Sequence, residues 1–477
     1  MLTILAAKIQ KSSPLTQKTS VTNYISIISK NAWRFLVDSN DLMYKLNKFT
    51  NFIVDGDNTI LFNLQTETFI VLNHELSEIV NTHKDDVVAL KDKHLELFQQ
   101  MLEKEFIIPS EKDEVASLIA EWKEQDNDPS YFGMIINPTL GCNLRCWYCY
   151  EEHEKKPIMD AKVVNSICRL IDEKVIFPQM RNLNVSFFGG EPLLGFKNVV
   201  LPILSFAASK CEEHGLNLNS NFTTNGVLLT DTVLTKLEQV GLTSPATFQI
   251  SLDGNRNYHN HSRIGANHEP TYDIIIKNII EAASRQHTVS VRLNYTAGNA
   301  QTFVDVLDDF CKLPIETKQF IVFNFQQIWQ DQTNDIQERI EKLKGLFRNE
   351  HFVVESDHVN HRHSCYADKE NNVVINSDGN IFKCTARDFI PENREGYLSE
   401  EGEIIWNTNF EKRMAIKYSN PACLKCKVLP ICNGGCSQNK LENMQSDSCY
   451  RNMDERDKDE LIIRCLKDRI LKQSKQK

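Results

Sequence analysis

Residues 141–150 read GCNLRCWYCY and place Cys142, Cys146 and Cys149 in a CxxxCxxC spacing. They follow an extended apolar segment, 133–137, so the three thiols are expected in a loop directly after a strand. Three thiolates at this spacing fit three corners of an iron–sulfur cubane and leave the fourth iron without a protein ligand. An open metal position is typical of a catalytic site, whereas a structural zinc ion, the alternative, takes four protein ligands.

The chain on both sides of this loop alternates between strand and helix patterns. Six extended segments lie at 133–137, 184–188, 216–222, 247–252, 288–296 and 319–325. Helical patterns between them include 161–175, 231–240, 273–285 and 302–312. Strands separated by helices favour βαβ units and a parallel sheet. Six units are too few for a closed eight-fold barrel, so we predict an α/β fold, a partial (β/α)6 barrel with its chemistry after the strand ends.

The composition of the whole chain limits its class and its partners. It has 477 residues, of which 41% are hydrophobic and 25% charged, as in soluble globular proteins. A net charge of −10 argues against non-specific nucleic-acid binding. No apolar run approaches the ~18 residues of a membrane span, and 199–208 fits a buried helix. The first residues lack the features of a signal peptide, so we expect a cytoplasmic protein without nucleic-acid or membrane partners.

Fourteen cysteines are too many for disulfides in a reducing compartment and indicate metal or iron–sulfur ligation. Apart from the first group, seven gather near the C-terminus, namely Cys365, Cys384, Cys423, Cys426, Cys432, Cys436 and Cys449. Zinc would explain a single CxxC pair among them but not the long-range spacing. Three others, Cys168, Cys211 and Cys311, fall on helical patterns and are predicted to pack as small hydrophobic residues.

Further polar segments follow the later strands. They are Gly189-Gly190-Glu191-Pro192, Thr223-Thr224-Asn225-Gly226, Ser251-Leu252-Asp253-Gly254 with His259 and Arg263 after it, and Arg292 with Asn294 on the fifth strand. Paired glycines let the backbone approach a ligand, and a carboxylate can pair with an ammonium group. Each segment taken singly is also explained by strand-end capping or turn formation.

With these motifs in this order, residues 133–325 resemble the radical S-adenosylmethionine (SAM) enzymes. The resemblance implies that Cys142, Cys146 and Cys149 hold a 4Fe–4S cluster that binds SAM. It also implies that SAM is cleaved to methionine and a 5′-deoxyadenosyl radical, which abstracts hydrogen from the substrate. The residues it assigns to SAM are Gly189, Gly190 and Glu191 at the amino group, Asn225, Ser251 at polar groups, Arg263 at the carboxylate and Asn294 near the ribose.

The C-terminal cysteines resemble the SPASM domain, which holds two auxiliary 4Fe–4S clusters, so three clusters are expected in all. The resemblance assigns Cys365, Cys384 and Cys436 to the first auxiliary cluster, and Cys423, Cys426, Cys432 and Cys449 to the second. Some SPASM enzymes carry an eighth cysteine where residues 357–364 here read DHVNHRHS. The first auxiliary cluster is therefore expected to keep an open iron or to use Cys465, a histidine or a substrate thiol.

These patterns predict the following order of domains: 1–42 an extension, 43–110 a winged-helix-like precursor-recognition module, 111–130 a linker, 131–345 the radical SAM core, 346–460 the SPASM domain and 461–477 a tail. The module is predicted from short strands at 51–54, 59–63 and 69–72 and helical patterns at 75–82 and 94–103. Met43 is an alternative start of the chain.

Three functions compete. The first is a radical SAM oxidoreductase that installs a thioether, C–C or ether cross-link in a ribosomally made precursor peptide. Its leader would bind the 43–110 module as an added strand, and flavodoxin or ferredoxin would supply electrons. The second is an anaerobic sulfatase-maturing enzyme, in which an aspartate beside an auxiliary cysteine serves as base; here Thr385 follows Cys384. The third, a non-catalytic scaffold, has no use for the glycine-rich and SLDG segments. We predict the first function, the cross-linking maturase. An alternative for the 43–110 module is that it only stabilises the barrel.

Overall fold

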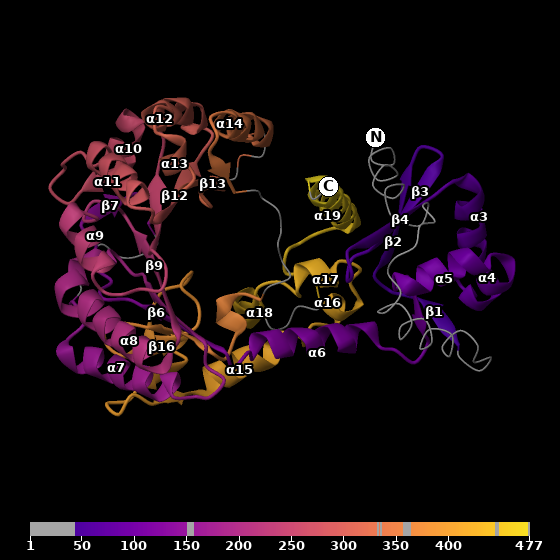
Figure 1. Cartoon of the computed structure of the whole chain (residues 1–477), viewed down its shortest axis with the longest axis horizontal. Coiled ribbons are helices and arrows are strands. Elements are labelled where there is room, and N and C mark those ends of the chain that lie inside the picture. The colour runs from indigo at the N-terminus through magenta and orange to yellow at the C-terminus, as the bar shows by residue number, and fades with distance from the viewer. Residues whose placement is uncertain are drawn as a thin grey trace, which may run out of the picture. The chain divides into compact units, whose positions relative to one another are not determined.

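The computed structural model describes residues 43–149, 157–331, 333, 336–355, 364–443 and 448–475 (Figure 1). The predicted extension 1–42, Tyr150 and the histidine-rich segment 356–363 lie outside the described residues. The described part divides into two compact units. Unit 1 contains residues 43–125, 364 and 415–475, and unit 2 contains 126–355 and 365–414 with the gaps given above.

Unit 2 is built on a row of six parallel strands. In the order of the sheet they are β6 (Tyr131–Ile136), β8 (Asn182–Phe187), β9 (Asn217–Thr224), β10 (Thr247–Leu252), β12 (Thr288–Tyr295) and β13 (Ile321–Gln327). The helices between them include α7 (Ala161–Val175), α8 (Leu201–His214), α9 (Asp231–Glu238), α11 (Tyr272–Ser284) and α12 (Phe303–Phe310). The predicted alternation of strands and helices is therefore confirmed, with boundaries shifted by a few residues at most.

Residue patterns explain why these segments form a helix-covered sheet. Along β8 the apolar residues Leu183, Val185 and Phe187 are buried and alternate with half-buried polar ones, as a strand's period of two requires. Neighbouring strands stack aromatic rings, with 5.1 Å between the ring centroids of Phe187 and Phe222. The helices line the outer side of the curved sheet (Figure 1), where α7 buries one apolar stripe at helical spacing.

The sheet of unit 2 continues beyond these six strands and becomes mixed. At one edge β14 (Val353–Val354) joins β13 in parallel. At the other, β15 (Asn372–Ile375) pairs in parallel with β6 and is followed by the antiparallel strands β16 (Asn380–Phe382), β17 (Gly396–Leu398) and β18 (Ile404–Trp406). Residues 365–414, predicted as part of the cysteine-rich domain, thus extend the sheet that carries the first cysteine loop.

Unit 1 joins two segments that are far apart in the sequence. Its N-terminal part has the antiparallel sheet β2 (Thr50–Asp55), β3 (Asn58–Asn63) and β4 (Thr68–Leu72), the ribbon β1 (Tyr44–Leu46) with β5 (Ile107–Pro109), and helices α3 (His74–His83), α4 (Val87–Lys93), α5 (Leu95–Glu103) and α6 (Glu114–Asp126). Its C-terminal part has the helices α16 (Pro421–Lys425), α17 (Leu429–Cys432), α18 (Ser437–Glu442) and α19 (Glu455–Lys475).

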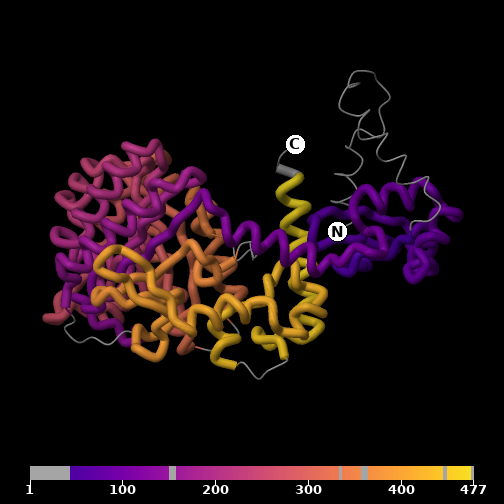
Figure 2. The backbone as a smooth tube through the Cα atoms, turned by 90° about the horizontal axis from the view of Figure 1, so that it is seen from below, coloured from indigo at the N-terminus to yellow at the C-terminus, as the bar shows by residue number. Residues whose placement is uncertain are grey.

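One apolar core holds the two parts of unit 1 together. Phe62 of β3, Trp122 of α6, Leu429 of α17 and Leu466 of α19 are all buried in it. Figures 1 and 2 show α19 beside the strands of the three-stranded sheet. The segments predicted as a linker and a tail therefore contribute helices α6 and α19 to this core.

One helical stretch among the described residues, Pro192–His214, has the length and apolar composition of a membrane span. No such stretch was expected from the sequence. More than half of its most apolar window is buried inside the protein, and core helices of soluble proteins meet the same criterion. Val199, Ile203 and Leu204 within it are fully buried, as predicted for 199–208.

Candidate functional site

The loop with the three N-terminal cysteines follows β6, the first strand of the parallel row. Within it β7 (Leu144–Cys146) forms a short antiparallel ribbon with β11 (Arg263–Gly265), and Cys146 lies opposite Arg263 in the register. Cys146 is buried, Cys142 is half-buried and Cys149 is exposed. The ribbon thus places a cationic side chain from the loop after β10 directly beside a predicted cluster ligand.

The thiols of this loop are electrostatically coupled to one another. Burial raises the pKa of Cys142 to about 11, and the nearby negative groups Glu191 and Cys146 act in the same direction. Burial also raises the pKa of Cys146, against the opposing effect of Arg263, while Cys149 adds to the rise. Because metal ligation requires thiolates, a bound metal must replace these protons.

The donor set, three cysteine thiols on one loop, is the kind that an iron–sulfur cluster takes. Within the described ranges, no three His, Cys, Asp or Glu side chains converge as one metal ion would require. Cysteines that bind a cubane attach to different irons, so their sulfurs need only surround it.

The two glycines after β8 let the backbone pack against the cysteine loop. Gly189 has φ +102°, and a Cβ atom there would clash with the carbonyl oxygen of Thr139. A Cβ atom on Gly190 would clash with the backbone of Gly141, the first residue of the cysteine loop. The Glu191 amide donates to the Gly141 carbonyl at 3.0 Å. In this structure the glycines therefore allow two loops to approach each other.

Glu191 is fully buried, and its carboxylate accepts hydrogen bonds from three donors of this chain. Thr224 Oγ1 lies 2.8 and 2.9 Å from its two oxygens and shares one proton between them, the Asn225 amide donates at 2.7 Å and the Leu193 amide donates at 2.9 Å. Burial raises the pKa of Glu191, although the hydrogen bonds oppose this shift. A carboxylate has about four acceptor positions. Three donated protons leave one of these positions without a donor among the described residues.

Asn225 connects the end of β9 to the cysteine loop. Its Nδ2 donates to Asn143 Oδ1 at 2.7 Å and lies 3.7 Å from Cys142 Sγ. Its Oδ1 accepts from the Val227 amide at 3.0 Å, which fixes the orientation of the side chain. Hydrogen bonds to ligand sulfurs orient them and tune the metal they bind.

A second set of polar contacts centres on Tyr148, which lies between Cys146 and Cys149 in the sequence. The Tyr148 hydroxyl donates to Asp253 Oδ1 at 2.9 Å. It accepts from an Arg263 guanidinium nitrogen at 2.7 Å and from Asn294 Nδ2 at 3.1 Å. Burial raises the pKa of Tyr148 far above its ordinary value, despite Arg263 nearby, so the phenol keeps its proton.

Asp253 extends this network through its other atoms. Its Oδ2 accepts from Ser262 Oγ at 2.7 Å, and its carbonyl oxygen accepts from Asn299 Nδ2 at 2.9 Å. The same Asn299 amide donates to the Asn294 carbonyl at 2.9 Å. His259 Nδ1 accepts from the Asp253 amide at 3.4 Å, and burial lowers the pKa of His259 well below its ordinary value. A neutral imidazole is the form that can accept this bond.

The structure gathers most of the predicted SAM residues at the carboxyl ends of the parallel strands. Glu191 and Asn225 are neighbours of Cys142. Arg263 is a neighbour of Cys146, and both Arg263 and Asn294 donate to the hydroxyl of Tyr148. Ser251 is half-buried near the end of β10 and lies opposite Arg292 of β12 in the register. Trp147, which directly follows Cys146, is 57% exposed and donates from its indole to Ser262.

Sequence reasoning assigned no role to Tyr148, Asp253 or Asn299. Tyr148 and Asp253 stand inside the quoted motifs, so their positions were visible although their contacts were not. Asn299 follows β12 without any motif around it, and no signal in the sequence identifies it.

Four C-terminal cysteines form a second coupled group, within unit 1. Cys432, Cys449 and Cys426 each influence the pKa of Cys423, which burial raises. Cys426 and Cys449 likewise influence Cys432, whose pKa burial also raises, against the opposing effect of Arg451. These are the four residues that the resemblance assigned to one auxiliary cluster. The half-buried Cys423, Cys426 and Cys432 pack against the core of unit 1.

The remaining three C-terminal cysteines belong to different units. Cys365 and Cys384 are in unit 2, and the exposed Cys436 is in unit 1. Tyr366 lies near both of the cysteines in unit 2, and its hydroxyl accepts from the Thr385 amide at 3.0 Å. Burial raises the pKa of Tyr366 to about 12.

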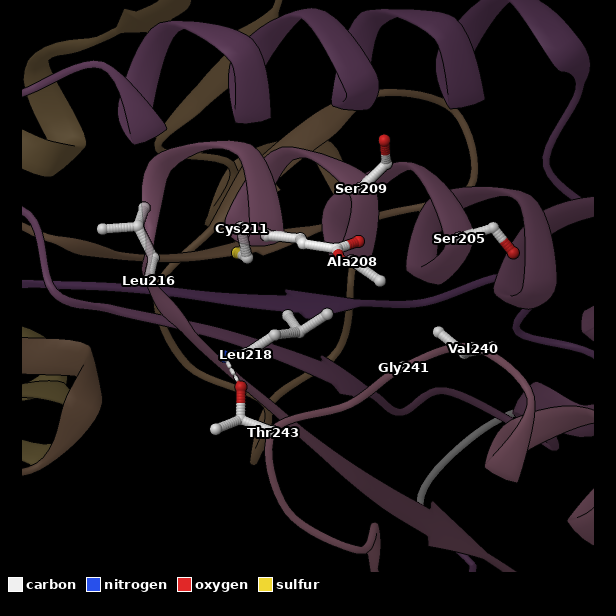
Figure 3. A pocket seen from close by; sticks show the side chains of 10 residues that line it. Ser205, Ala208, Ser209, Cys211, Leu216, Leu218, Val240, Gly241 and Thr243 are labelled. Atoms are coloured by element: carbon white, nitrogen blue, oxygen red, sulfur yellow. Dashed lines mark hydrogen bonds between the residues drawn. The ribbon is translucent and has the colours of Figure 1, made fainter.

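An open pocket lies between α8, the start of β9 and the loop after α9 (Figure 3). Ser205, Cys211 and Leu216 line one side, and Val240 and Thr243 line the other. It adjoins the amino end of β9, whereas the predicted site residues follow the carboxyl ends of the strands. No predicted SAM or cluster residue lines this pocket.

Comparisons with known proteins agree with this geometry. The family model of the radical SAM superfamily matches residues 136–310. The radical SAM cyclopropyl synthase TigE of Paramaledivibacter caminithermalis is 25% identical over 313 residues, which are 58% of this chain and 60% of that protein. The cysteine-type anaerobic sulfatase-maturating enzyme of Clostridium novyi is 25% identical over 354 residues, 65% of this chain and 89% of that enzyme.

Among solved structures, native anSMEcpe with bound AdoMet has a similar fold, with a TM-score of 0.53 at 17% identity. The similarity covers 72% of this chain and 100% of that one. The matched residues 136–310 contain the cysteine loop, the glycine pair and the strand-end network described above. This chain therefore carries a radical SAM domain.

Proposed function

We propose that this chain is a radical SAM/SPASM maturase that installs a thioether, C–C or ether cross-link in a ribosomally made precursor peptide. The observation that carries the proposal is the side-chain connection between the cysteine loop and the carboxyl ends of β9, β10 and β12. Parallel α/β folds place their chemistry at these strand ends. The named relatives, a cyclopropyl synthase and a sulfatase-maturating enzyme, support peptide or protein substrates.

Cys142, Cys146 and Cys149 would hold the SAM-binding cluster, which when reduced supplies the electron that cleaves SAM to a 5′-deoxyadenosyl radical. Asn225 orients the Cys142 sulfur, and the Cys146–Arg263 ribbon keeps a cation beside the second thiolate. The other predicted SAM contacts are Gly189, Gly190, Glu191, Ser251 and Asn294.

The precursor's leader would bind unit 1. In its three-stranded sheet, β2 and β4 are edge strands, and an extended peptide gains affinity by adding a strand to such an edge. No residue of β2 is fully buried, so its backbone lies near the surface. Flavodoxin or ferredoxin would serve as the electron donor.

Two auxiliary 4Fe–4S clusters would accept the electron released when the cross-link closes. The coupled group Cys423, Cys426, Cys432 and Cys449 supports one of them. The other rests on the sequence resemblance, with Cys365, Cys384 and Cys436 as ligands.

The test is a mass spectrum of a candidate precursor co-expressed anaerobically with this protein, beginning with short reading frames beside its gene. Loss of two hydrogens per modified site, with linked fragments after digestion and no reaction with carbonyl reagents, is the expected result. An unmodified peptide from every neighbouring frame, despite active SAM cleavage, would contradict the cross-linking proposal.

The second candidate is a sulfatase-maturing enzyme, favoured by the match that covers 89% of the Clostridium novyi enzyme. Against it, Thr385 stands where that family places a catalytic aspartate beside an auxiliary cysteine. The Thr385 hydroxyl lies 2.6 Å from the Tyr366 hydroxyl, and neither group is a base at neutral pH. A carbonyl-reactive product in the same mass spectrum would establish this alternative.

A further inference from the structure

The Tyr148 hydroxyl uses its whole hydrogen-bonding capacity inside the protein. A hydroxyl offers one donor and two acceptor positions. Here the donor serves Asp253, and the acceptors receive Arg263 and Asn294. Asp253 directly follows β10, Arg263 is the first residue of β11 and Asn294 lies near the end of β12. A single phenol from the cysteine loop therefore connects three separate segments of unit 2.

Arg263 is held by this phenol and yet is incompletely bonded. Its side chain is only 7% exposed, and its Nε has no hydrogen-bond partner in the part of the chain that the structure describes. Its guanidinium is cationic, because arginine is not deprotonated in proteins. Buried N–H groups in proteins are almost always paired, so a cationic Nε without a protein acceptor indicates a ligand acceptor.

We propose that Tyr148 is a positioning residue, whose phenol holds the Arg263 guanidinium so that its Nε is kept for the carboxylate of SAM. The inference rests on the proposed radical SAM function and adds a specific role for a residue that carries no charge and binds no metal. Without the hydroxyl, Arg263 and Asn294 lose their shared acceptor, and the guanidinium can turn toward Asp253 instead. The ligand carboxylate would then meet a misplaced or neutralised cation.

The experiment is a thermodynamic cycle between protein and ligand. Dissociation constants of SAM and of decarboxylated SAM are measured anaerobically by calorimetry, for the cluster-loaded wild-type protein and for Tyr148→Phe. At equal iron content per protein, the ratio of the two constants isolates the contacts of the ligand carboxylate, because a general loss of fold weakens both ligands. Tyr272→Phe is the control, since the buried Tyr272 of α11 also donates its hydroxyl to a carboxylate, that of Asp309, at 2.7 Å.

The wild-type protein is expected to prefer SAM over decarboxylated SAM by more than about tenfold, as a charge-assisted hydrogen bond allows. In Tyr148→Phe this preference should fall by about tenfold, mainly through weaker SAM binding, whereas Tyr272→Phe should keep it. An unchanged preference in Tyr148→Phe overturns the proposal. A wild-type protein that binds neither ligand overturns the radical SAM function instead, so the two failures are distinguishable.

Asn294→Ala keeps the test decisive if Tyr148→Phe loses its iron or its fold. This variant removes one of the two donors to the phenol and leaves the tyrosine ring in place. Any lost ribose contact would weaken both ligands equally and cancel in the ratio. A fall of about threefold in the preference is expected, and an unchanged preference overturns the proposal.

Discussion

The two coupled cysteine groups lie in contrasting surroundings. In unit 2 the loop around Cys142 and Cys146 is fixed by hydrogen bonds from polar side chains at strand ends. In unit 1 Cys423, Cys426 and Cys432 pack against an apolar core that also contains the N-terminal strands. Polar networks fix orientation at little gain in stability, whereas apolar burial stabilises without fixing direction. We therefore expect the first group to control chemistry and the second to control the integrity of unit 1.

The strongest test of this contrast removes the thiols of unit 2. Replacing Cys142, Cys146 and Cys149 together by alanine should lower SAM cleavage by at least about three orders of magnitude, because no cluster remains to supply the electron. The stability of unit 1, measured by the hydrogen-exchange rates of the β3 amides, should stay unchanged. Cys311→Ala, at the end of α12 outside both groups, is the control. Persistent formation of 5′-deoxyadenosine by the triple variant would contradict the assignment.

The converse change removes one thiol of unit 1. Cys426→Ser should reduce bound iron and stop product formation more severely than SAM cleavage. Because metal binding energy contributes to folding, it should also destabilise unit 1 by several kcal/mol, on the order of 3. Hydrogen exchange should accelerate in β3 and α19 but not in β10. Equal acceleration in β10 would show that the two groups do not differ in the way we infer.

A core substitution tests whether the N- and C-terminal parts of unit 1 unfold together. Leu466 of α19 is fully buried, whereas Leu471 on the same helix is 49% exposed. Leu466→Ala should destabilise unit 1 by about 3 kcal/mol, the usual cost of such a cavity, and should expose β3 amides to exchange. Leu471→Ala should cost less than about 0.5 kcal/mol. Protection of β3 that is unaffected by Leu466→Ala would mean that the strands fold independently of α19.

The smallest expected effect concerns His287, which precedes β12 in unit 2. Burial lowers the pKa of His287, although the Ala246 carbonyl and Glu238 act in the opposite direction. The folded state therefore binds its proton less readily than the unfolded state, so stability is lost as the pH falls below about 6.5. The loss should be at most about 1.4 kcal/mol per pH unit in urea unfolding between pH 7 and 5. His287→Phe should remove this component, and the exposed His261→Phe should leave it intact.

Much of the fold was predictable because it depends on local patterns. The predicted strands at 247–252 and 288–296 alternate apolar and polar residues, as a strand in a sheet requires. The predicted helix at 161–175 coincides with α7. The candidate site was predictable in part, since the cysteine spacing and the GGEP and SLDG segments occur at strand ends. The hydrogen bonds from Thr224 and Asn225 to Glu191 were not, because these two residues are more than 30 positions away in the sequence.

By itself the sequence determined the parallel α/β architecture and the residues able to ligate metal, since both follow from periodicity and spacing along the chain. Only the tertiary structure decided that Tyr148 meets Asp253 and Arg263, and that α19 shares a core with β3. Contacts between residues more than 100 positions apart depend on how the whole chain closes. A local pattern shows that a side chain can bond or be buried, and the folded chain selects its partner.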